Sequence, residues 1–195
     1  MATIFIPRER SAGERRVATV PAAVTKLART GLEVVVEPGA GAAAGLEDGA
    51  YVDAGARLAE GEDLAQAAVV ARVAPPTLEE VRALAPGTVL LTFVAPHRNL
   101  EVVGALAEAR ITTIAMELVP RISRAQPMDA LSSQANISGY RAVVTAAYEL
   151  DKYFPLFMTA AGTIKPATPA PSTTTVAGRI VPAAVMNSGK YLSSS

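Results

Sequence analysis

Short apolar runs alternate with amphipathic stretches along most of the chain. Five compact apolar runs, each bounded by turn residues, are typical of strands buried on both faces; they lie at residues 3–6, 32–36, 67–73, 88–94 and 111–116. Between and after them, helices are predicted at 17–28, 50–54, 77–84, 99–109 and 129–150. Strands that alternate with helices indicate an α/β fold, with a mostly parallel sheet and helices on both of its faces.

Two local signals support the predicted helix ends. Gly31 follows the last residue of helical spacing in the first helix, and glycine is the preferred residue just after a helix. Thr77 is a good N-cap, and Glu79 and Glu80 place negative charge in the first turn that follows it.

The C-terminal end of the chain differs in composition from the rest. Residues 166–195 contain three prolines within six positions, a run of threonines and a serine-rich end. Such a composition favours irregular structure over a packed core. We therefore predict an α/β domain at residues 1–165, followed by an irregular Pro/Thr/Ser-rich tail at residues 166–195.

Composition narrows the class of protein. The 195 residues include 18 Lys and Arg, 18 Asp and Glu, one His and no Cys. The zero net charge disfavours a nucleic-acid partner, and the absence of Cys excludes disulfides and thiolate metal sites. No apolar run approaches the ~20 residues that cross a bilayer, and the N-terminus places apolar residues before charges, opposite to a secretory signal. We expect a cytoplasmic protein without a metal.

The richest polar cluster lies at residues 121–134, between the last predicted strand and the long helix. Arg121, Gln126, Asp129 and Ser132 supply a cation, an amide, a carboxylate and a hydroxyl. Ligands of open α/β sheets bind beyond the carboxyl ends of strands, and these groups suit a ligand with a carboxamide or phosphates. Asp129 and Ser132 also have N-cap chemistry, so a segment that only caps the helix is the alternative.

The same cluster carries a resemblance to a known family. Residues 116–126, 128–137 and 139–142 closely resemble the alpha subunit of proton-translocating NAD(P) transhydrogenases. The resemblance runs from Ile4 to about Ala167. It includes the segments at 14–18, 39–41 and 158–164.

The resemblance implies a two-domain, NAD(H)-binding subunit that works as a homodimer. It would dock on membrane-embedded subunits, where an NADP(H)-binding domain meets it, so the protein would be cytoplasmic but peripheral to the inner membrane through its partners. Hydride transfer between the two nicotinamides would be coupled to proton movement.

The resemblance also assigns roles to the polar cluster. Arg121 would hold the nucleotide, Asp129 and Ser132 would orient the carboxamide, and Gln126 would face the second nucleotide. These roles are positional, and no residue is assigned as a catalytic acid or base, because direct hydride transfer needs little proton chemistry. Pro127 stands where the family usually has a small polar residue, and it would stiffen the segment.

Alanine dehydrogenases resemble the same part of the chain and share Arg16. They use a Lys and a His on their oxo-acid substrate, and the matching positions here are Ala74 and Ala95. Neither side chain can pair with a carboxylate or exchange a proton. His97 is close in sequence, but a lone His beside a proline is more typical of a solvated loop. Amino-acid dehydrogenase activity is therefore the less favoured interpretation.

One departure from the family concerns the phosphate-binding turn. After Ala167 the family continues into a Rossmann strand and a Gly-x-Gly-x-x-Gly turn, but residues 168–175 here are Pro- and Thr-rich and no such turn follows. Gly39–Ala40–Gly41 lacks the third glycine and the helix that such a turn needs. We therefore expect that the chain is truncated before the Rossmann domain and that the isolated chain is inactive.

Two hypotheses follow from the missing turn. In the first, the chain is one piece of a transhydrogenase, and other segments complete the nucleotide site. In the second, it is an inactive half-subunit that acts only as a folded or dimerising module.

Overall fold

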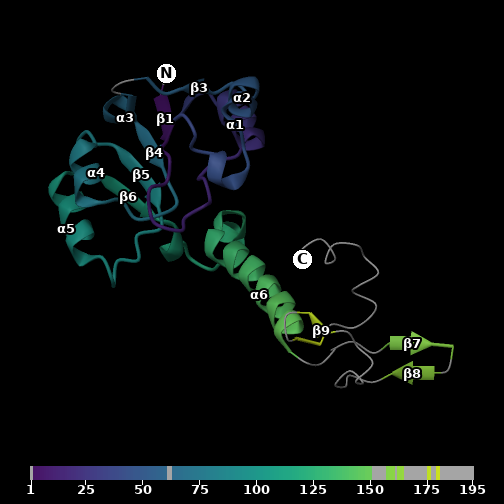
Figure 1. The fold of residues 1–195 in the computed structure, drawn as a ribbon. Helices are drawn as coiled ribbons and strands as arrows, with labels where there is room; N and C mark the ends of the chain where they lie inside the picture. Colours follow the sequence, from purple (N-terminus) through teal and green to yellow (C-terminus); the bar gives the residue numbers. More distant parts are fainter. Residues whose placement is uncertain are drawn as a thin grey trace. The chain divides into compact units, whose positions relative to one another are not determined.

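The computed structural model describes residues 2–60, 63–150, 157–160, 162–164, 175–176 and 179–180 (Figure 1). The chain divides into two compact units, residues 1–131 and residues 132–195. The predicted boundary between residues 165 and 166 lies outside the described residues.

The first unit is built on a six-stranded sheet in which every pairing is parallel. The strands are β1 (Ala2–Ile6), β2 (Leu32–Val36), β3 (Arg57–Leu58), β4 (Val69–Ala71), β5 (Val89–Thr92) and β6 (Thr112–Ala115). Their order across the sheet is β3-β2-β1-β4-β5-β6. The five predicted strands and the parallel α/β fold are thus confirmed, while the two-residue edge strand β3 was not predicted.

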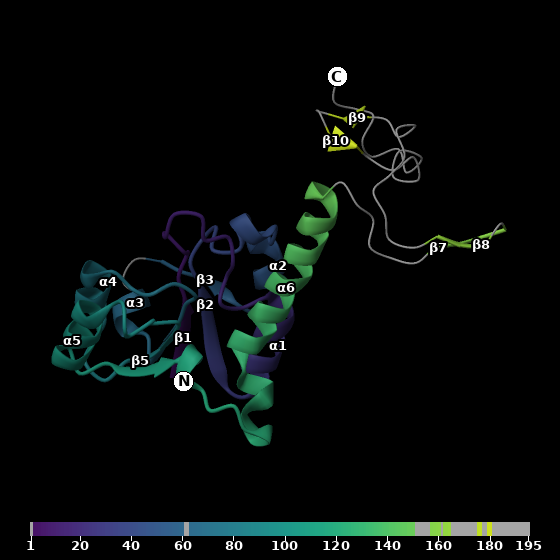
Figure 2. The ribbon, with the colours of Figure 1, turned by 90° about the horizontal axis from the view of Figure 1, so that it is seen from below.

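Helices cover both faces of this sheet, as predicted (Figure 2). One face carries α1 (Pro21–Arg29) and α2 (Asp48–Asp53), and the other carries the remaining three, which are α3 (Asp63–Gln66), α4 (Leu78–Ala83) and α5 (Leu100–Glu108). Three short 3₁₀ helices lie in the connections: η1 (Ala42–Ala44), η2 (Met116–Leu118) and η3 (Ser123–Met128).

The alternation of side chains along β1 creates a separate core on each face. Ile4 and Ile6 point into a cluster with Val24 of α1 and Tyr51 of α2. Phe5, between them, belongs to the opposite cluster, with Val70, Val81, Leu90 and Leu106. Burial on both faces explains why the inner end of β1, residues 4–6, is continuously apolar rather than alternating.

The predicted helix ends are largely confirmed. Thr77 accepts a hydrogen bond from the Glu80 backbone N–H at 3.2 Å, and Glu80 accepts one from the Thr77 N–H at 2.7 Å, which completes a capping box. Gly31 has a φ of +83° just after α1. The first helix starts at Pro21 rather than at residue 17, because proline fits the first helical position but cannot donate within a helix.

The second unit contains the long helix α6 (Ala130–Glu149), which begins at the unit boundary. Two short antiparallel pairs follow: β7 (Phe157–Thr159) with β8 (Gly162–Ile164), and β9 (Thr175–Val176) with β10 (Arg179–Ile180). Within the described residues, no helix combines the length and the apolar character needed to cross a membrane.

Candidate functional site

The carboxyl ends of all six strands lie at one edge of the sheet, because every strand is parallel. Strand order reverses between β1 and β4, and the crevice at such a reversal is where open α/β sheets bind ligands. Charged residues follow the strands at this edge: Glu9 after β1, Glu37 after β2, Arg72 after β4 and Glu117 after β6.

A buried charge cluster occupies the reversal point. The Arg72 guanidinium lies 3.5 Å from Glu9 and 2.7 Å from Glu80, and the Arg72 and Glu9 side chains are only 5% and 3% exposed. Glu9 also accepts hydrogen bonds from the backbone N–H groups of Val73 and Ala74, at 2.5 and 3.3 Å. The cluster therefore ties the ends of β1 and β4 together and occupies two backbone donors there, those of Val73 and Ala74.

A second carboxylate does the same at the neighbouring strand ends. Glu117 Oε1 accepts hydrogen bonds from the backbone N–H groups of Val94 (2.9 Å) and Ala95. Ala95 has a φ of +48°, a left-handed conformation that costs free energy for any residue with a Cβ. Thr92, fully buried, donates to the Ala74 carbonyl at 2.9 Å and so joins the two braced segments.

The segment after β1 contains a bidentate ion pair that belongs to the same edge. Arg16 donates to Glu14 through Nε at 2.8 Å and through Nη2 at 2.6 Å. The Arg16 hydrogen bonds hold the pKa of Glu14 at about 2, below its ordinary value of 4.5. Glu14 is therefore ionised at neutral pH, and much of the Arg16 charge is already matched.

The predicted site residues lie in and around η3. Arg121 and Gln126 are exposed, and Ala125, buried to 5% exposure, anchors the segment between them. Asp129 is half-buried, and its backbone N–H donates to the Gln126 carbonyl at 3.2 Å. Arg121, Gln126 and Asp129 thus share one short segment of the first unit, with the Arg121 and Gln126 side chains open to a ligand.

Ser132 is exposed on the first turn of α6 and belongs to the second unit. Asp129 directly precedes Ala130, the first residue of α6, so its position also suits the capping interpretation. Pro127 lies inside η3, where its ring restricts the backbone of the segment as the sequence predicted.

Gly39–Ala40–Gly41 forms a packed turn. The Gly39 N–H donates to both carboxylate oxygens of Asp48, at 2.9 and 3.1 Å. A Cβ on Gly41 would lie 2.7 Å from the Leu46 carbonyl oxygen and 2.7 Å from the Tyr51 ring. These glycines are explained by packing and by the Asp48 contact, and this turn offers no free Gly39 N–H to a phosphate.

We expect Gly41→Ala to destabilise the protein by about 2 kcal/mol, because the added methyl group overlaps backbone and a buried ring. Gly49→Ala is the matched control: Gly49 lies inside α2, and a methyl group there would meet no described atom within 4 Å, so helix propensity predicts a small gain. Urea unfolding of both variants measures the difference, and equal stability of the two would contradict the packing role of Gly41.

The chain belongs to the family of alanine dehydrogenase/PNT N-terminal domains, whose model matches residues 5–138. It is 49% identical to a protein of Rhodospirillum rubrum that is the first of the separate parts of an NAD(P) transhydrogenase subunit alpha, over 84% of this chain and 44% of that protein. It is 34% identical to alanine dehydrogenase of Geobacillus stearothermophilus, over 76% of this chain and 40% of that protein.

A solved structure confirms the fold. The transhydrogenase from Sinorhizobium meliloti matches with a TM-score of 0.76 and 46% identity, over 83% of this chain and 49% of that one. The chain thus spans less than half the length of each of these relatives.

The residues that brace the strand ends were not predicted to belong to the site. Glu9 and Glu117 belong to no local pattern, and Glu80 was predicted only as an acidic residue of the first helical turn after Thr77. Arg72, however, stands inside an apolar run predicted as a strand, which is an unusual place for a charge. A buried cation of this kind requires carboxylate partners, so the sequence could have predicted that acidic residues lie near Arg72.

Proposed function

We propose that this chain forms the nicotinamide-facing N-terminal portion of an NAD(P) transhydrogenase alpha subunit, with NAD(H) as its ligand. The similarity to the Rhodospirillum rubrum subunit, which extends over 84% of the chain, carries the proposal. The exposed Arg121 and Gln126 side chains, on a segment anchored by buried Ala125, support it.

The described residues suit one end of the dinucleotide better than the other. Arg121 offers a guanidinium and Gln126 an amide, which suit a ribose-phosphate oxygen and a carboxamide. At the sheet edge several backbone donors are already occupied, those of Val73 and Val94 by Glu9 and Glu117, and that of Gly39 by Asp48. Other segments of the working subunit would therefore hold the pyrophosphate.

The role of this chain in the reaction is positional. The bound nicotinamide supplies the hydride chemistry, and the protein supplies orientation. Arg121 would fix the nucleotide through its charge, while Asp129 and Ser132 would orient the carboxamide and Gln126 would face the second nucleotide. Small errors in such positioning cost large factors in rate, which explains the need for an anchored segment.

The partners proposed for the whole subunit follow the same similarity. They are a second copy of the chain, membrane-embedded subunits and an NADP(H)-binding domain. The alternative, a folded module without catalysis, makes the same structural contacts but requires no nucleotide contact at Arg121. Alanine dehydrogenase activity is less favoured, because positions 74 and 95 carry only methyl groups, and exposed His97 has no described contact that would place it at a substrate.

The nucleotide contact is tested with the full chain and reduced NAD. In ¹H–¹⁵N spectra we expect NADH at millimolar concentration to shift resonances of residues 121–129, with binding weakened about 10-fold or more in Arg121→Ala, the cost of one charged hydrogen bond. Arg124→Ala removes a second exposed guanidinium of the same segment and is the matched control. Equal binding by the two variants would contradict the role of Arg121.

A further inference from the structure

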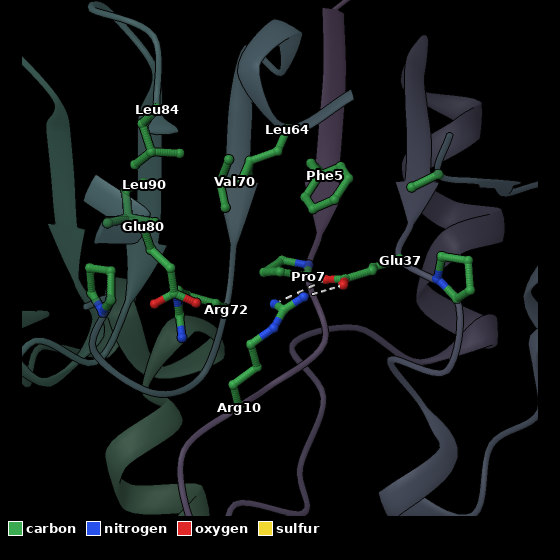
Figure 3. Close-up of a pocket in the computed structure, with 13 residues that line it drawn as sticks. Phe5, Pro7, Arg10, Glu37, Leu64, Val70, Arg72, Glu80, Leu84 and Leu90 are labelled. Atoms are coloured by element: carbon green, nitrogen blue, oxygen red, sulfur yellow. Dashed lines mark hydrogen bonds and ion pairs between the residues drawn. The ribbon is translucent and has the colours of Figure 1, made fainter. Parts of the chain in front are cut away.

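A cavity that the proposed function does not use lies within the first unit, on the sheet face covered by α3, α4 and α5. Its volume is about 280 Å³. Its apolar walls come from β1, α3, β4, β5 and the end of α4, and consist of Phe5, Leu64, Val70, Leu84 and Leu90. Figure 3 shows these side chains on one side of a row of charged groups. Four of the five are less than 9% exposed, so the walls are fixed by the core.

Two ion pairs border the cavity. Arg10 Nη2 lies 2.5 Å from Glu37 Oε1, and Arg72 Nη1 lies 2.7 Å from Glu80 Oε2. Figure 3 shows the Arg10–Glu37 pair and the Glu80 carboxylate along the same border. An apolar interior bordered by a few fixed polar groups is the usual form of a small-molecule site.

The charges at this border do not balance. The single positive charge of Arg72 is shared by two carboxylates, Glu9 and Glu80, while Arg10 matches Glu37. The five side chains therefore sum to one negative charge. Arg72 and Glu9 are too deeply buried for solvent to screen their charges well. A cationic ligand could therefore reach the excess negative charge only at Glu80, the more exposed carboxylate.

Glu80 is the partly exposed carboxylate of this border, with its side chain 23% exposed. Its Oε2 accepts hydrogen bonds from Arg72 and from the Thr77 N–H, and the Thr77 side chain also hydrogen-bonds the carboxylate. Burial raises the pKa of Glu80, but the Thr77 and Arg72 contacts outweigh burial and lower it below the ordinary value. Glu80 is therefore ionised at neutral pH, and its partly exposed carboxylate has lone pairs for a further donor.

We propose that this cavity binds a small organic monocation, a primary ammonium attached to an aromatic or branched aliphatic body. The ammonium group donates to the Glu80 carboxylate, and the body packs against Phe5, Val70 and Leu90. The volume suffices, since a cavity of roughly 150 Å³ already holds a benzene ring. A carboxylate ligand fits less well, because the cavity border already carries an excess negative charge, with Arg10 paired to Glu37 and the Arg72 charge shared by Glu9 and Glu80.

The test uses the full chain and a set of ligands that differ only in the head group. Phenethylammonium is titrated against 2-phenylethanol and phenylacetate, with ¹H–¹⁵N spectra as the measurement. We expect phenethylammonium to bind with a Kd of about 1 mM or tighter, which is modest for nine non-hydrogen atoms. The shifted resonances should be those of the cavity walls, and the alcohol and the carboxylate should bind about 10-fold more weakly or not at all.

Two variants separate the charge from the cavity. Glu80→Gln should weaken phenethylammonium binding about 10-fold, whereas Glu79→Gln, the same change on the exposed neighbouring residue, should leave it unchanged. Ala59→Phe places a ring in the cavity and should abolish binding without altering any charge. If Glu80→Gln perturbs the fold, the ligand series and the Ala59→Phe variant still test whether the cavity binds the amine.

Three results would overturn the proposal. These are binding of phenylacetate as tight as that of the amine, undiminished amine binding by Ala59→Phe, or no cavity-wall shifts at 10-fold the expected Kd. The test does not involve NADH, so its failure would leave the proposed function untouched.

Discussion

Replacing Arg72 by Met is expected to destabilise the first unit by about 3–5 kcal/mol, the usual cost of removing one partner from a buried ion pair. Glu9 would remain almost fully buried, at 3% exposure, without its cation. Glu80 can turn toward solvent, because its side chain is 23% exposed, but Glu9 is held by the Val73 and Ala74 N–H groups. Since a domain of this size is stable by only ~5–15 kcal/mol, the midpoint of urea unfolding should fall markedly.

The double variant Glu9→Gln/Arg72→Met separates the charge effect from the loss of packing. Without either charge no deeply buried ion is left unpaired, and the Gln amide oxygen can still accept the shorter of the two backbone hydrogen bonds, that from Val73, so much of the lost stability should return. Arg82→Met, on the exposed side of α4, should change stability by less than about 0.5 kcal/mol. If Arg72→Met were as stable as Arg82→Met, the cluster would not hold the strand ends together.

Replacing Glu117 by Ala is expected to destabilise the protein by about 3 kcal/mol, because two backbone donors lose their acceptor at roughly 1–3 kcal/mol each when they stay buried. Val94 is only 3% exposed and Ala95 is half-buried, so water reaches their N–H groups poorly. Ala95 would also lose a contact that supports its φ of +48°. Urea unfolding measures the effect, with Glu108→Ala on the exposed face of α5 as the control.

A second change tests the backbone contribution to this effect. Glycine adopts a positive φ at little cost, so Ala95→Gly in the Glu117→Ala background should recover about 1 kcal/mol. The same change in the parent protein should gain no less, because the strain is present there too. A further loss of stability on adding Ala95→Gly would show that the conformation of Ala95 is not strained.

The fold was largely predictable because the central strands β1, β2, β4 and β5 are largely buried and therefore appear in the sequence as apolar runs. The edge strand β6 is more exposed but lies within the apolar run at residues 111–116. β3 has only two residues at the sheet edge, with Arg57 exposed, so it leaves no periodicity to detect. The start of α1 was missed because residues 17–20 continue the helical spacing, although Pro21 sets the first turn.

The candidate site was predictable only where its residues are neighbours in sequence. Arg121, Gln126 and Asp129 fall within one short segment, so the local sequence pattern is enough to select them as candidates. The contact of Glu9 with Arg72 depends on β1 lying beside β4, an order that the sequence of elements does not reveal. The same holds for Glu117, which reaches the end of β5 because β6 pairs with it.

We propose that this chain contacts the nicotinamide end of NAD(H) more strongly than the pyrophosphate. The most direct measurement compares the affinities of NADH and reduced nicotinamide mononucleotide for the full chain. Because Glu9, Glu117 and Asp48 occupy backbone donors at the described sheet edge, we predict Kd values near 1 mM or weaker that agree within about 3-fold. NADH binding tighter than that of the mononucleotide by about 100-fold or more would show a functional phosphate site and contradict the account.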